Sequence, residues 1–145
     1  MNISLNDITQ DNYEAVCLLD VYEEQEDFVA SNTWSLVESH YNSHYTALAI
    51  YLDETPIGFF MWVQEKVDQI DVWRFMIDKK FQKKGMGKRA FALALLKIRE
   101  NANINKIGIC YDQENTVAKK FYASFGFQEY GLDEDQEEIL AMLHL

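Results

Sequence analysis

The stretch from Trp73 to Glu100 constrains the fold of this chain more than any other, because a strand, a tight basic turn and a helix follow one another without a break. Before the turn, every second residue is large and apolar, and this period of two predicts a strand with these residues on one face: Trp73, Phe75 and Ile77. After the turn, apolar residues recur at helical spacing: Phe91, Ala94, Leu95 and Ile98.

The turn itself, Gln82 to Lys88, predicts a site for an anion. Gly85 and Gly87 let the backbone bend tightly and approach a ligand where a Cβ atom would block it. Backbone N–H groups at the start of the following helix have no intrahelical partner and carry the positive end of the helix dipole. Three lysines add positive charge: Lys83, Lys84 and Lys88. Such a turn suits a pyrophosphate.

Three interpretations of this turn compete. It is a solvated glycine-containing loop, or a dinucleotide fingerprint, or a motif of the form Q-x-x-G-x-G placed directly after a strand. The dinucleotide pattern fits Gly85 to Ala90 by letter, but it requires an acidic residue about 20 residues further on, where Asn103 to Asn105 stand and Asp112 comes late. A chain of 145 residues is also short for the two halves of a dinucleotide-binding fold.

The rest of the chain predicts a mixed α+β fold. Strands are expected over residues 2–6, 45–52, 57–63, 70–77, 104–110, 127–130 and 138–143. Helices are expected over 13–19, over 34–41, after the glycine turn and over 116–124. The expected N-caps are Thr9 or Asp11 for the first, one of residues 31–33 for the second and Asn115 for the last. This gives a six- to seven-stranded mixed sheet flanked by about four helices. No linker interrupts it, so we expect a single domain over residues 1–145.

A second motif strengthens the third interpretation of the turn. Asn115, Ala118, Tyr122 and the pair Gly126-Phe127 fit the spacing N-x-x-A-x-x-x-Y-x-x-x-G-F. Together with the Q-x-x-G-x-G turn and the element order, this segment resembles the GNAT N-acetyltransferase superfamily, and the resemblance spans nearly the whole chain. Phe28 to Asn32, Trp73 to Asp78 and the Asn115 segment resemble, more narrowly, bacterial spermine/spermidine (diamine) acetyltransferases.

The resemblance implies acetyl-CoA as co-substrate and a direct attack of the acceptor amine in a ternary complex. The coenzyme-binding residues that it implies are Phe75, Met76, Ile77, Gln82, Lys83, Lys84, Gly85, Met86, Gly87, Lys88, Asn115, Lys119 and Tyr122. Tyr122 is also implied as the general acid for the leaving thiolate, since a phenol can donate a proton. Helix capping alone would also account for Asn115.

The acceptor is expected to be a small cationic amine. Carboxylates are the expected partners of its ammonium groups. Glu23, Glu24 and Asp71 are also candidate bases acting through water, and Glu24 is the one assigned to catalysis. The residues proposed from sequence for this role are Glu23, Glu24, Asp27, Asp71 and Glu134. Solvated loop remains the alternative interpretation of the acidic stretch 21–28. Two other functions stay open: acetylation of a protein N-terminus, a lysine or an aminoglycoside, and non-catalytic acyl-CoA binding.

The net charge of −11 argues against nucleic acid and anionic membrane as partners. No apolar run is long enough to span a membrane, and no signal peptide is visible. Cys17 and Cys110 are far apart and are expected to be buried thiols in a reducing, cytoplasmic compartment. The histidines form no metal-binding pattern, so no metal is expected. A homodimer is implied by analogy with the family alone.

Overall fold

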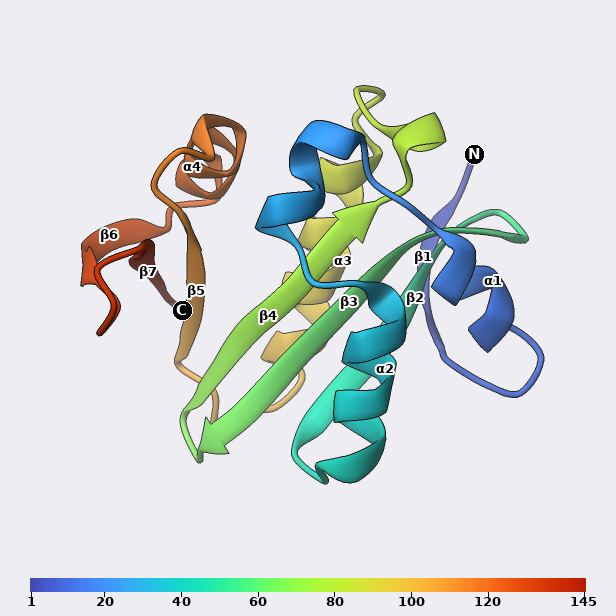
Figure 1. Ribbon diagram of the computed structural model, residues 1–145. Helices are drawn as coiled ribbons and strands as arrows, with labels where there is room; N and C mark the ends of the chain where they lie inside the picture. The colour runs from blue at the N-terminus through green and yellow to red at the C-terminus, as the bar shows by residue number, and fades with distance from the viewer.

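The computed structural model describes residues 1–145, which form one sheet with helices on both faces (Figure 1). The strands are β1 (Ile3–Asp7), β2 (Tyr45–Leu52), β3 (Thr55–Lys66), β4 (Gln69–Ile77), β5 (Lys106–Asp112), β6 (Gln128–Leu132) and β7 (Glu138–His144). The helices are α1 (Tyr13–Leu18), α2 (Asn32–Tyr41), α3 (Met86–Arg99) and α4 (Thr116–Ser124), with 3-10 helices η1 (Glu23–Phe28) and η2 (Lys79–Phe81). The predicted mixed sheet and four helices are confirmed.

The strand order is β1-β2-β3-β4-β5-β7-β6. All neighbours run antiparallel except β4 and β5, which are parallel and are connected through α3. In Figure 1, α1 and α2 lie in front of the sheet and α3 lies behind it. Two apolar clusters follow from these layers. The larger one contains Phe91 of α3, and the smaller one contains Val16 of α1.

Several local predictions are corrected by the structure. The first helix is preceded by Asn12, and neither Thr9 nor Asp11 caps it. Residues 23–28 form η1, where no helix was predicted. The predicted strand 57–63 begins earlier, at Thr55, because only Asp53 and Glu54 form the turn after β2. Pro56 therefore lies inside β3, beside a register shift where a missing N–H is tolerated. Ser31 and Asn115 cap α2 and α4 as predicted.

The alternation expected in β4 is broken at Trp73. Arg74 pairs with Met61 and Val72 pairs with Trp62, so Trp73 is an extra residue in the pairing of β3 with β4. A bulge of this kind moves the following side chains to the opposite faces of the sheet. Phe75 therefore packs in the larger cluster, whereas Trp73 packs in the smaller one, with its ring 5.3 Å from that of Tyr45. The prediction that Trp73 shares a face with Phe75 is wrong.

The sheet opens between β4 and β5. These strands pair only from Gln69 to Val72, opposite Lys106 to Ile109. Beyond Val72 they diverge, with η1 beside the end of β4 and α4 beside the end of β5 (Figure 1). The edge of β4 from Trp73 to Ile77 therefore has no strand beside it on that side. Since unpaired strand edges offer N–H and C=O groups, this edge is available to a ligand.

The two cysteines are not buried, contrary to expectation. Cys17 on α1 is half-buried, and Cys110 on β5 is exposed. Cys110 belongs to a strand that borders the opening, and its thiol lines the cavity there, partly shielded by neighbouring side chains. No helix combines the length and the hydrophobicity that a membrane crossing requires.

Candidate active site

A cavity of about 910 Å³ lies in the opening between β4 and β5. Its lining comes from β4 (Val72 to Ile77), from η1 and its flanks (Val21, Glu24 to Ala30), from the end of β5 and from α4. This volume is in the range of small-molecule sites. Four elements, β4, η1, β5 and α4, therefore meet around one space because the central strands separate.

The glycine turn forms one end of the cavity. Gln82, Lys83 and Gly87 line it, whereas the other predicted residues of the turn, Lys84, Gly85, Met86 and Lys88, are not among the lining residues. No backbone N–H from Gln82 to Lys88 has a hydrogen-bond acceptor within the protein. Gly85 has φ +80° and stands at the N-cap of α3, a conformation that favours glycine. The turn thus presents a row of free donors at a helix N-terminus, which is suited to phosphate oxygens.

The β4 edge presents mainly its backbone to the cavity. The ring of Phe75 stacks on Phe60, with centroids 4.5 Å apart. The side chain of Met76 is buried on the other face, where its Sδ lies 3.6 Å from Asn32 Nδ2. Ile77 is also buried. Because the side chains of this edge pack into the cores and every second residue of an antiparallel strand directs its N–H and C=O away from its partner, the outward main-chain groups of Phe75 and Ile77 are the polar atoms that the edge offers to a ligand.

Tyr122 of α4 faces the cavity opposite this edge. Its ring stacks on that of Tyr111, with centroids 5.9 Å apart and planes inclined by 19°. The Tyr122 hydroxyl has no hydrogen-bond partner in the protein, and burial raises its pKa well above 10. The phenol therefore keeps its proton at neutral pH and has a free O–H to donate.

Asn115 uses one side-chain atom for capping and leaves the other free. Its Oδ1 accepts from the Ala118 N–H at 3.1 Å, which starts α4. Its Nδ2 makes no hydrogen bond, and the residue lines the cavity. Helix capping and contact with a ligand are therefore compatible, because they involve different atoms.

Lys119 lies outside the cavity lining and has a partner within the protein. Its Nζ is 3.3 Å from Glu129 Oε1, while the Tyr111 hydroxyl donates to Glu129 Oε2 at 2.7 Å. Glu129 of β6 thus joins α4 to β5. The Tyr111 hydrogen bond is the main reason that the pKa of Glu129 is lowered.

The structure divides the carboxylates predicted for the acceptor. Glu24 and Asp27 line the cavity, whereas Glu23 of the same 3-10 helix does not. Asp71 lies where β4 still pairs with β5, and its Oδ1 accepts from Gln69 Nε2 at 2.8 Å. Glu134 lies in the exposed turn between β6 and β7. Glu23, Asp71 and Glu134 are therefore not brought together with the other two.

Sequence reasoning missed four cavity carboxylates. They are Glu26, Asp112, Glu114 and Glu138. Asp112 and Glu114 immediately precede the Asn115 motif, which was a usable signal. Glu138 reaches the cavity only because β7 inserts beside β5 and pairs Glu138 with Asp112, so no local pattern could have found it.

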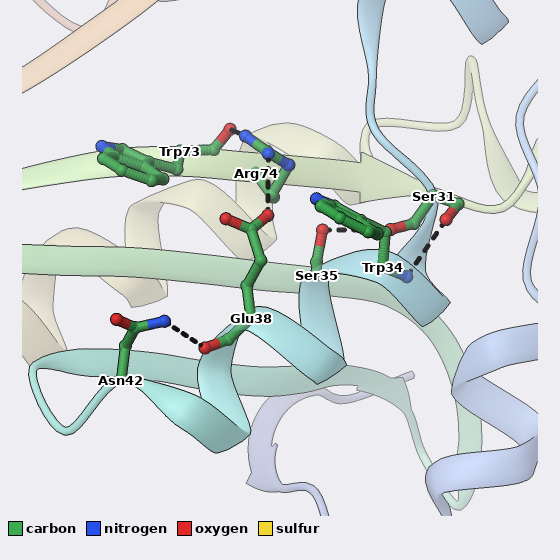
Figure 2. Close-up of polar contacts among 7 residues, drawn as sticks. All are labelled: Ser31, Trp34, Ser35, Glu38, Asn42, Trp73 and Arg74. Carbon is green, nitrogen blue, oxygen red and sulfur yellow. Dashed lines mark hydrogen bonds and ion pairs between the residues drawn. The ribbon is translucent and has the colours of Figure 1, made fainter.

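Arg74 and Lys83 are the two cationic side chains in the lining. Glu38 extends from α2 to Arg74 and forms an ion pair at 3.3 Å, and Arg74 Nη1 donates to the Trp73 carbonyl at 2.9 Å (Figure 2). The Arg74 charge is thus compensated by a carboxylate outside the cavity. Six lining carboxylates (Glu24, Glu26, Asp27, Asp112, Glu114 and Glu138) face little remaining positive charge.

No histidine lines the cavity, and Cys110 is unsuited to act as a base. Partial burial, followed by a hydrogen bond with Glu138, raises the pKa of Cys110 to about 12. The thiol therefore stays protonated at neutral pH. Carboxylates are the remaining candidates for accepting a proton, directly or through water.

Residues 3–127 match the acetyltransferase (GNAT) family. The spermine/spermidine N(1)-acetyltransferase of Bacillus subtilis (strain 168) is 28% identical over 148 residues, covering 97% of each chain.

Among solved structures, the spermidine N-acetyltransferase from Vibrio cholerae, in complex with CoA and spermine, has a TM-score of 0.80 at 17% identity and covers 98% of this chain and 95% of its own. The PaiA N-acetyltransferase from Thermoplasma acidophilum, in complex with coenzyme A, has a TM-score of 0.75 at 18% identity, with full coverage of both chains. These two likenesses establish the fold. The family match spans most of the chain, which therefore belongs to the GNAT family and is an N-acetyltransferase.

Proposed function

We propose that this enzyme transfers the acetyl group of acetyl-CoA to a primary amine of a small polyamine. The observation that carries the proposal is one cavity with a row of free N–H donors at one end and six carboxylates along its walls. An anionic coenzyme and a polycationic acceptor have opposite requirements, and this site meets both. The sheet includes residues from Ile3 to His144, which supports a single domain.

The coenzyme half of the proposal rests on two unpaired stretches of backbone. The N–H groups of Gln82 to Lys88 would hold the pyrophosphate, with Lys83 beside them. The open edge of β4 from Phe75 to Ile77 would hydrogen-bond the pantetheine arm as an added strand. A main-chain N–H of this edge would also stabilise developing negative charge on the carbonyl oxygen. The co-substrate supplies the acetyl thioester, and Asn115 Nδ2 is free to orient the arm.

The acceptor half rests on charge. An alkylamine has a pKa of about 10.4 and therefore arrives protonated. Carboxylates on opposite walls, Glu24 and Asp27 on η1 and Glu138 on β7, would pair with ammonium groups at different points along a flexible chain. Glu24 is the proposed base, accepting the proton of the reacting amine through water. The B. subtilis and V. cholerae relatives, whose names state polyamine acetylation, agree with this substrate class.

Tyr122 is the proposed proton donor. Its hydroxyl is unpaired, its pKa is raised by burial, and it lies across the cavity from the β4 edge. The leaving sulfur is a weak base that benefits from a donor.

Turnover of acetyl-CoA with a panel of acceptors tests the proposal. The panel contains spermine, spermidine, a diamine, a lysine peptide, an N-terminal peptide and an aminoglycoside. We expect turnover with the polyamines and a large loss of amine kcat/KM for Glu24→Gln and Asp27→Asn. Glu14→Gln, an exposed carboxylate on α1 outside the lining, is the matched control. Turnover restricted to peptides or the aminoglycoside, or coenzyme binding without turnover, would refute the polyamine assignment.

A further inference from the structure

The 3-10 helix η1, which carries Glu24 and Asp27 on one wall of the cavity, is linked to the glycine turn by a reciprocal pair of side-chain amides. Gln25 Nε2 donates to Gln82 Oε1 at 3.1 Å, and Gln82 Nε2 donates to Gln25 Oε1 at 3.0 Å. The two residues are 57 positions apart in sequence, and both line the cavity. The wall with the acceptor carboxylates and the turn with the free N–H groups are therefore directly connected.

Each glutamine of this amide pair is also fixed to its own element. Gln82 Nε2 donates to the Ile77 carbonyl, at the end of β4, at 2.8 Å. Gln25 Oε1 accepts from the Tyr22 N–H, at the start of η1, at 3.1 Å. A second contact runs parallel to the pair, since Lys83 Nζ lies 5.9 Å from the centre of the Tyr22 ring. A displacement of the turn therefore moves η1, and a displacement of η1 moves the turn.

The η1 segment has little else to hold it. None of its residues is buried, so it contributes nothing to either apolar core. Its N-terminal approach is fixed by Asp78, whose Oδ2 accepts from the Asp20 N–H at 3.0 Å. Val21 and Val29, on either side of η1, pack against the smaller apolar cluster. Within η1 itself, Gln25 is the residue whose side chain forms hydrogen bonds to the β4 side of the cavity. Segments with few buried contacts open at low cost, so such a link strongly affects their position.

We propose that Gln25 is a positioning residue that couples the two halves of the site. A ligand on the turn immobilises Gln82 and, through the amide pair, fixes η1 with Glu24 and Asp27 in place for the amine. The Gln82 side chain thus serves the acceptor wall, while its backbone N–H remains free for the phosphate. Coupling of this kind is reciprocal, so the amine also strengthens coenzyme binding. The inference rests on the proposed function, and the tests below separate the two.

Hydrogen exchange with coenzyme A alone tests the link without an acceptor. In the wild-type protein we expect coenzyme A to slow exchange in the turn, residues 82–88, and in η1, residues 22–28. In Gln25→Met, which keeps side-chain length but removes both bonds of the amide pair and the bond from the Tyr22 N–H, we expect protection of the turn only. The matched control is Gln64→Met, at the far end of β3, whose amide makes one long contact of 3.4 Å. This control is expected to behave as wild type.

Each outcome decides one question. If coenzyme A protects neither segment in the wild-type protein, the proposed function fails. If it protects the turn but not η1, the proposed function stands and the coupling is refuted. Protection of η1 in Gln25→Met would also refute the coupling.

Kinetics supply a readout that a merely structural role would not change. We expect Gln25→Met to raise the KM for spermidine roughly tenfold, the size expected for losing a pair of neutral hydrogen bonds. The dissociation constant for coenzyme A alone should change by less than about twofold, because the phosphate donors remain in place. In the wild type, saturating coenzyme A should tighten spermidine binding by about fivefold or more, and in the variant this factor should approach one. An equal loss of affinity for both ligands would overturn the proposal.

Discussion

Replacing Tyr122 by phenylalanine removes one hydroxyl from the site and nothing from the core. The Tyr122 hydroxyl has no hydrogen-bond partner in the protein, whereas its ring packs against Phe91, Tyr111 and Phe127. Phenylalanine preserves those ring contacts. The substitution therefore separates proton donation from packing, which few substitutions in an active site achieve.

The expected magnitude follows from this geometry. Loss of a general acid lowers kcat by about 10²- to 10⁴-fold, which corresponds to about 2.7–5.4 kcal/mol of transition-state stabilisation. The free energy of unfolding should change by no more than about 1 kcal/mol, since no intramolecular hydrogen bond is lost. The KM for acetyl-CoA should change little, because the phosphate donors lie on the turn after β4.

The neighbouring Tyr111 supplies a matched control on the same aromatic stack. Its hydroxyl donates to Glu129 at 2.7 Å, so Tyr111→Phe loses a bond to a charged acceptor. At about 1.5–3 kcal/mol for this bond, the variant should melt about 4–10 °C below wild type and lose less than about tenfold in kcat. The assay is steady-state release of free thiol with spermidine as acceptor, combined with thermal unfolding monitored by circular dichroism.

The two variants should therefore show opposite patterns, one catalytic and one structural. If Tyr122→Phe keeps more than a tenth of wild-type kcat, Tyr122 is not the proton donor. If it unfolds as easily as Tyr111→Phe, the hydroxyl has a structural partner and the reasoning from its unpaired state is wrong.

Three further predictions concern the turn, the core and alkaline pH. Gly85→Ala should lower the free energy of unfolding by about 1 kcal/mol, because φ is +80° and no atom crowds the new Cβ. It should also weaken coenzyme A binding several-fold, as measured by calorimetry. Unchanged affinity would mean that the phosphates bind elsewhere. Phe91→Ala should lower the free energy of unfolding, measured in urea, by about 3–5 kcal/mol because Phe91 is fully buried. The control Leu96→Ala, at an exposed position, should lower it by less than about 0.5 kcal/mol. Equal losses would contradict the assigned core. The folded state raises the pKa values of Cys110, to about 12, and of Tyr122, so it retains protons that the unfolded chain releases above about pH 9. Stability should therefore be fully present below pH 9 and fall as the pH rises towards 12, and urea midpoints that stay level between pH 8 and 11 would exclude this linkage.

The element order was predictable because most segments carry their own signals. The apolar run of β2, the Asn115 cap of α4 and the helical spacing in α3 are properties of neighbouring residues, and their predicted positions agree with the structure. The errors lie where a distant partner decides. The Trp73 bulge depends on the pairing of β4 with β3, and η1 forms where a charged stretch gave no periodic pattern.

The candidate site also has one part that local sequence predicts and one part that depends on distant partners. The turn from Gln82 to Lys88 could be recognised from sequence, because its glycines, lysines and free N–H groups are consecutive. The carboxylates proposed to bind the acceptor amine could not be recognised as one site from sequence. Glu24 and Asp27 of η1 and Glu138 of β7 come from two distant parts of the chain, and the equally acidic Glu134 and Asp71 lie outside the cavity.

Neighbouring residues specify the strand, the glycine turn and the helix that together offer an anion site, because backbone conformation over a few residues depends on those residues. Three features instead arise from long-range packing: β4 and β5 separate after Val72, β7 brings Glu138 beside Asp112, and Gln25 contacts Gln82. Strand pairing and side-chain contacts across the sheet depend on the packing of the whole molecule, and no local pattern encodes them.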